Sequence, residues 1–200
     1  MGKAKIAVLV SGGGTNLQAL IDAQKNGIIS SGEITLVIAN NAGAYALARA
    51  ANSGIKSAVV LKKECGSQAA FEQKIKDLLT QYSIDLIVLA GFMSILSEDF
   101  TRDYPKRILN VHPSLIPSFC GAGFYGLRVH EEALRYGVKV TGATVHFVNE
   151  IPDGGEIIFQ KAVEIQEGDT PEILQRRVME QAEWKILPAA VEKISKQLVG

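Results

Sequence analysis

The chain has 200 residues, of which 47% are hydrophobic and 21% are charged, a composition that can bury a full core and differs from that of disordered chains. Its 21 Lys and Arg residues balance its 21 Asp and Glu residues, which argues against broad electrostatic binding to nucleic acid. The sequence has no run of about 18 apolar residues, so we expect no membrane span.

The first half of the chain alternates short apolar runs, typical of buried strands, with amphipathic stretches typical of helices. The pattern predicts strands at Ile6–Val10, Ile34–Ala39, Lys56–Val60, Asp85–Ala90 and Ile108–His112. It predicts helices at Asn16–Asn26, Ala44–Ser53 and Ser67–Tyr82. Strands and helices that alternate with short connections predict an α/β fold, with a mostly parallel twisted sheet and flanking helices.

The pattern changes after residue 112. Residues 113–126 hold two prolines and three glycines and predict a long loop, a kind of segment that is usually functional. A helix at Val129–Tyr136 and two partly antiparallel late strands, Val140–Val148 and Glu156–Val163, follow the loop. A C-terminal helix begins at Asp169–Glu172, and we expect Pro188 to kink or divide it. We expect residues 1–200 to form one domain, with a phosphate-binding N-terminal half and a catalytic C-terminal half.

The segment Ser11–Asn16 (Ser-Gly-Gly-Gly-Thr-Asn) joins the first strand to the first helix. Glycines let the backbone approach an anion closely, and a helix N-terminus offers free N–H groups and a positive dipole end. The loop therefore predicts a phosphate site, helped by the Thr15 hydroxyl and the Asn16 amide. The alternative is a plain turn that is capped by Thr15 or Asn16. The loop lacks the Walker A ending and the dinucleotide fingerprint.

Asn110 and His112 lie two positions apart at the end of a buried strand, so their side chains share one face. Ligands of open α/β sheets bind beyond the carboxyl ends of strands, and an amide with an imidazole can form a polar pocket over a carbonyl group. The alternative is a structural histidine. Asp153 lies in a turn between the late strands, where an ordinary turn aspartate is the alternative.

His130 and His146 are weaker candidates. Three histidines without clustered carboxylates argue against a catalytic metal. Cys65 and Cys120 fit no metal spacing, and free thiols indicate a reducing compartment, which is expected to be the cytoplasm.

Five segments, taken together and in this order, resemble the phosphoribosylglycinamide formyltransferases. They are Ser11–Ala19, Leu89–Met93 with Ile95–Ser97, Asn110–Pro117, Gly142–Val148 with Asp153–Gly155, and Ala182–Pro188. The resemblance covers nearly the whole chain. It implies a Rossmann-like formyltransferase fold, 10-formyltetrahydrofolate as cosubstrate and a ribonucleotide amine as acceptor. It implies no metal, nucleic acid or membrane partner, and it is compatible with a homodimer.

The resemblance also implies roles for individual residues. Gly14, Thr15 and Asn16 would hold the phosphate of the ribonucleotide, and Glu183 would lie near its amine. The folate would be bordered by Met93, Ser94, Ile95 and Leu96, with Asn110. The catalytic residues would be Asn110, His112 and Asp153. We expect the Asn110 amide and a protonated His112 to stabilise an oxyanion, while Asp153 favours the imidazolium and accepts a proton from the amine.

The chain departs from the family pattern around the folate. Ser94 and Gln68 stand where many or some members have arginine, Ser118 replaces a common lysine, and residues 119–126 differ from a shorter Pro-Gly version. A formyltetrahydrofolate hydrolase, a methionyl-tRNA formyltransferase and a noncatalytic phosphate- or folate-binding module are the alternatives. A nicotinamide-dependent oxidoreductase would need the full glycine fingerprint and an acidic residue after the second strand, where this chain has Asn40 and Asn41.

Overall fold

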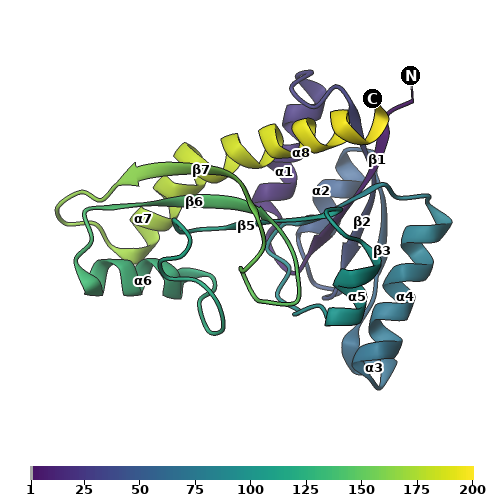
Figure 1. Ribbon diagram of the computed structural model, residues 1–200, viewed down its shortest axis with the longest axis horizontal. Helices are drawn as coiled ribbons and strands as arrows, with labels where there is room; N and C mark the ends of the chain where they lie inside the picture. The colour runs from purple at the N-terminus through teal and green to yellow at the C-terminus, as the bar shows by residue number, and fades with distance from the viewer. Residues whose placement is uncertain (1) are drawn as a thin grey trace.

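The computed structural model describes residues 2–200, which contain a seven-stranded sheet with the strand order β3-β2-β1-β4-β5-β6-β7 (Figure 1). The strands are β1 (Ala4–Val10), β2 (Gly32–Ala39), β3 (Lys56–Val59), β4 (Leu86–Leu89), β5 (Ile108–His112), β6 (Val140–Phe147) and β7 (Ile157–Glu164). The first five strands are parallel, and β6 is antiparallel to both β5 and β7. The prediction of a mostly parallel sheet with partly antiparallel late strands is confirmed.

The sheet separates two hydrophobic layers, and alternate residues of β1 enter each of them. Ile6 and Val8 pack with α1 (Thr15–Lys25), α2 (Ala46–Asn52), α7 (Pro171–Val178) and α8 (Trp184–Val199). Ala7 and Leu9 pack with α4 (Gln68–Gln81) and α5 (Glu98–Asp103) on the other face. Because side chains alternate along a strand and both faces of this sheet are covered, the central strands are continuous apolar runs.

Two short helices were not expected from the sequence. These are α3 (Lys62–Cys65) and α5, which have 4 and 6 residues. Such lengths are too short to show a 3.6-residue period. The helix α6 (Leu127–Tyr136) follows the long loop, as expected, and packs against α7. No helix within residues 2–200 combines the length and apolar character that a membrane crossing requires.

The C-terminal helix is not divided at Pro188, which lies inside α8, and the kink expected there stays a prediction. The helix is irregular just before this point, where Met179–Glu183 forms the π-helical segment η1. A proline at position 188 frees the carbonyl of Trp184, four residues earlier, and Trp184 is the first residue of α8. Segments of π-helix occur often at functional sites.

Candidate active site

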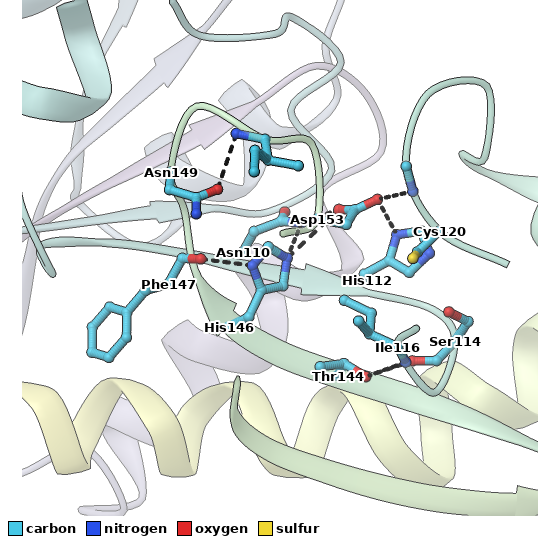
Figure 2. Close-up of polar contacts among 12 residues, drawn as sticks. Asn110, His112, Ser114, Ile116, Cys120, Thr144, His146, Phe147, Asn149 and Asp153 are labelled. Carbon is cyan, nitrogen blue, oxygen red and sulfur yellow. Dashed lines mark hydrogen bonds and ion pairs between the residues drawn. The ribbon is translucent and has the colours of Figure 1, made fainter. Parts of the chain in front are cut away.

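Four polar side chains converge at the carboxyl end of β5 (Figure 2). Asn110 and His112 belong to β5, His146 belongs to β6, and Asp153 lies on the loop between β6 and β7. Asn110 Nδ2 lies 3.4 Å from Asp153 Oδ1, and His112 Nδ1 lies 3.4 Å from Asp153 Oδ2. The structure therefore brings together the three residues that the sequence nominated as catalytic.

The turn that carries Asp153 is fixed by its own backbone conformation and by two glycines, Gly155 and Gly121. Asp153 has φ 56°, a left-handed geometry that aspartate tolerates better than most residues. At Gly155, an added Cβ would lie 1.7 Å from the Phe147 carbonyl oxygen, so only glycine fits. Gly121 N donates a 2.9 Å hydrogen bond to Asp153 Oδ2, which ties the carboxylate to the long loop.

Burial acts on the pKa of Asp153, but other groups outweigh it. Burial alone would raise this pKa, while the contact with His146, the charge of His112 and the Gly121 N–H bond lower it. The net result is a lowered pKa, so the carboxylate is ionised at neutral pH. An ionised carboxylate in a partly buried site can accept a proton during catalysis.

The imidazole of His112 is almost fully buried, and acceptor atoms lie beside both of its nitrogens. Nε2 lies 2.8 Å from the Phe119 carbonyl oxygen, and Nδ1 faces Asp153. Burial lowers the pKa of His112, and the opposing effects of Asp153 and the Phe119 carbonyl do not outweigh it. The carboxylate thus lies beside the ring as expected, but its effect on the pKa of His112 is smaller than that of burial.

His146 belongs to this cluster, although the sequence analysis ranked it low. It pairs with Asn110 in the β5–β6 register, and its Nε2 lies 3.2 Å from Asn110 Nδ2 and 3.6 Å from Asp153 Oδ1. Its Nδ1 lies 2.8 Å from the Phe147 carbonyl oxygen. Because that carbonyl only accepts, Nδ1 carries a proton and Nε2 can accept from the Asn110 amide. The antiparallel register is the signal that would have found this residue.

A cavity of about 610 Å³ opens above the cluster. Residues 91–95 line one part of it, residues 121–126 of the long loop line another, and Asn16, Gln175, Met179 and Glu183 line a third. His130 of α6 is part of the wall, is fully buried and has no hydrogen-bond partner within residues 2–200 for either ring nitrogen. Burial, with a smaller effect of His112, lowers the pKa of His130 to about 4.

The segment that resembles a folate pocket is exposed and anchored by its neighbours. Met93, Ser94 and Ile95 line the cavity, whereas Leu96 packs into the core beneath them. Asn40 Nδ2 donates a 2.8 Å bond to Ser94 Oγ. Gln68 Nε2 donates a 3.1 Å bond to the Ile95 carbonyl oxygen. Ser94 and Gln68, two of the positions that depart from the family pattern, thus make local contacts that hold this segment.

The glycine loop lies at the rim of the cavity. Gly14, with φ 71°, precedes α1, and Thr15 is exposed with only a 3.7 Å contact from its hydroxyl to Met179 Sδ. Of the three proposed phosphate contacts, only Asn16 lines the cavity. Asn16 Nδ2 donates a 2.7 Å bond to Glu183 Oε2, which uses one of its two N–H donors, and its part in phosphate binding stays a prediction.

Glu183 is an ionisable group held inside the protein at the π-helical segment. It is 6% exposed and receives the Asn16 bond. Burial raises its pKa to about 7, against the effect of the Asn16 bond. A carboxyl group with this pKa exchanges its proton near neutral pH, and strongly shifted pKa values are typical of functional sites.

The chain is similar to proteins of known family along almost its whole length. Residues 4–191 match the formyl transferase family model. The chain is 44% identical to the phosphoribosylglycinamide formyltransferase of Haemophilus influenzae, over 94% of this chain and 85% of the relative. It is 47% identical to the trifunctional purine biosynthetic protein adenosine-3 of Gallus gallus over 96% of its own length, which is only 18% of that protein.

The fold agrees with solved structures. A crystal structure of glycinamide ribonucleotide transformylase 1 from Symbiobacterium toebii has a TM-score of 0.91 and 40% identity, and the match covers 98% of this chain and 89% of that one. The phosphoribosylglycinamide formyltransferase of Brucella melitensis has a TM-score of 0.88 and 40% identity, with 96% of each chain covered. The family model and these relatives together show that the chain belongs to the formyl transferase family.

Proposed function

We propose that this protein transfers the formyl group of 10-formyltetrahydrofolate to the amine of N1-(5-phospho-D-ribosyl)glycinamide. The products would be the N-formyl ribonucleotide and tetrahydrofolate, in de novo synthesis of purines (IMP). The observation that carries the proposal is the convergence of Asn110, His112 and Asp153 beneath one cavity. The names of relatives in the same family support the choice of acceptor and pathway.

The reaction begins when the amine attacks the formyl carbon, which leaves negative charge on the formyl oxygen. Asn110 and His112 would donate hydrogen bonds to that oxygen, and one such donor typically contributes a factor of about 100 to 1000 in rate. The Nε2–H of His112, now beside the Phe119 carbonyl, would turn to the substrate. Because an adjacent negative charge favours the imidazolium, the developing oxyanion would raise the pKa of His112 again.

Asp153 is the proposed acceptor for the proton of the attacking amine, directly or through a water molecule. Its lowered pKa keeps it ionised for that role. The new C–N bond to the acceptor remains, the C–N bond to the folate breaks, and the folate nitrogen takes up a proton. Proton transfer of this kind is typically worth about 100- to 10,000-fold.

The two substrates would enter the cavity from different sides. The folate would lie along Met93–Leu96 beside Asn110, and the ribonucleotide would lie between the glycine loop and Glu183. The phosphate would be held by the free N–H groups of the loop at the start of α1. The N-terminal half would thus bind the phosphate, and the C-terminal half would carry the catalytic residues. A homodimer and a cytoplasmic location remain predictions, and the two free cysteines fit a reducing compartment.

The proposal is tested by a coupled absorbance assay of purified protein with a 10-formylated folate, with and without the ribonucleotide. Release of the deformylated folate only in the presence of the ribonucleotide is the expected result. Equal release without it would identify a hydrolase instead. Binding of both ligands without any turnover would identify a noncatalytic module.

A further inference from the structure

The cavity contains little positive charge for a phosphomonoester. Neither lysine nor arginine is among the residues that line it within residues 2–200, although a phosphate ester of this kind carries close to two negative charges at pH 7. Binding of the phosphate would therefore depend on backbone N–H groups and on positive charge on the opposite side of the loop that carries them. The only guanidinium in hydrogen-bond contact with the glycine loop within that range is Arg49 of α2.

The carbonyl groups of the glycine loop accept hydrogen bonds on the side of the loop that faces α2. Three consecutive carbonyls accept hydrogen bonds from the segment that leads into and forms α2: Ser11 from Asn41 Nδ2 at 3.4 Å, Gly12 from Ala46 N at 3.1 Å, and Gly13 from Arg49 Nε at 2.8 Å. In a trans peptide the N–H points opposite to the carbonyl. The N–H groups of Gly12, Gly13 and Gly14 therefore point away from α2, and none donates a hydrogen bond within residues 2–200. Successive free N–H groups of this kind form an anion-binding concavity.

Arg49 is itself held on three sides, which makes it a rigid support. Besides the Gly13 carbonyl, its Nη1 donates a 3.1 Å bond to Gln18 Oε1 of α1, and its guanidinium lies 5.0 Å from the centre of the Tyr45 ring. Gly14 also packs closely against α2, since a Cβ added to Gly14 would lie 2.7 Å from Ala46 Cβ. Of the three donors, Arg49 makes the shortest bond and is the only charged one.

We propose that Arg49 is a positioning residue for the acceptor phosphate. It holds the Gly13–Gly14 peptide with its N–H toward the ligand, and it places a positive charge behind a loop that faces a dianion. Arg49 acts through the loop and does not itself touch the phosphate. This inference rests on the proposed function, because it assigns the glycine loop to the phosphate of the ribonucleotide.

The test compares Arg49→Met, which keeps the length of the apolar stem, with Arg49→Lys, which keeps the charge. Hydrogen bonds to charged groups are typically worth enough to change affinity by about ten- to a hundredfold. Arg49→Met should raise the KM for the ribonucleotide by about that factor and leave kcat and the folate KM unchanged. Arg49→Lys should recover most of the loss. Arg102→Met, which removes an exposed arginine in a surface ion pair, is the matched control and should match the wild type.

A second readout does not depend on turnover: calorimetric titration with ribose 5-phosphate in the absence of folate. The wild type should bind this phosphomonoester more tightly than Arg49→Met does. An unchanged ribonucleotide KM in Arg49→Met, or an equal rise of both KM values with a lower melting temperature, would overturn the inference. If the wild type showed no formyl transfer but Arg49-dependent ribose 5-phosphate binding, the proposed function would fail while the role of Arg49 would stand.

Discussion

Replacing Glu183 by glutamine removes a buried ionisable group whose cost to folding depends on pH. The rise of the Glu183 pKa from its ordinary 4.5 to about 7 corresponds to about 3 kcal/mol, because one pKa unit is worth about 1.4 kcal/mol. Below pH 4.5 the carboxyl group is protonated in the folded and unfolded states alike. As the pH rises through 4.5 to 7, only the unfolded state releases the proton, so the wild type loses stability across that window. Glutamine stays neutral and can still accept the Asn16 bond.

The free energy of unfolding of the wild type and of Glu183→Gln would be measured by urea denaturation at pH 5 and pH 8. From pH 5 to pH 8, the free energy of unfolding of the variant should rise by about 2.5 kcal/mol relative to that of the wild type. The acid-sensitive His130 contributes to both proteins, so it cancels in the difference. The same substitution should weaken turnover, since Glu183 lies where the acceptor amine is proposed to bind. A stability difference that is equal at both pH values would refute the reasoning.

Three further changes test other parts of the structure. Asp153→Asn should lower kcat by about 100- to 10,000-fold while leaving the fold intact, and near-normal turnover would exclude Asp153 as the proton acceptor. The pKa of His130, lowered from 6.5 to about 4, means that the unfolded state binds a proton first as the pH falls. His130→Phe should therefore abolish an acid loss of about 3 kcal/mol between pH 6.5 and 4, which urea titrations at both ends would detect or disprove. Gly155→Ala should destabilise the fold by about 3 kcal/mol or more, because its Cβ would strike the Phe147 carbonyl. Gly43→Ala, whose Cβ would meet only Asn41 Oδ1 at an ordinary 3.5 Å, is the control in thermal melts, and equal melting temperatures would contradict the steric argument.

Local sequence patterns predicted most of the fold because each central strand is an apolar run covered on both faces. The strand Ile108–His112 has the predicted bounds, and the helix expected at Ser67–Tyr82 spans Gln68–Gln81 with Ser67 as its N-cap. The C-terminal helix is not divided at Pro188, and its irregular part is the π-helical segment before α8, which no local pattern predicted.

Residues of the candidate site were predictable from local sequence only where polar side chains lie at the end of a strand. Asn110 and His112 stood out because two positions on one strand share a face, whereas Asp153 entered through family resemblance. His146 was identified as part of the site only from the antiparallel register, which places it opposite Asn110. His130 was identified as part of the cavity wall only from the structure, in which α6 packs against α7.

The sequence by itself determined the alternation of strands and helices, the glycine loop at the start of α1 and the three nominated catalytic residues. These features depend on residues that are close together along the chain or on motifs that they form. Only the tertiary structure decided the pKa shifts of the site. Burial lowers the pKa of His112 although a carboxylate lies beside it, and burial raises the pKa of Glu183 to about 7. Loss of water around a charge depends on everything that packs against it, and the packing partners come from distant parts of the chain.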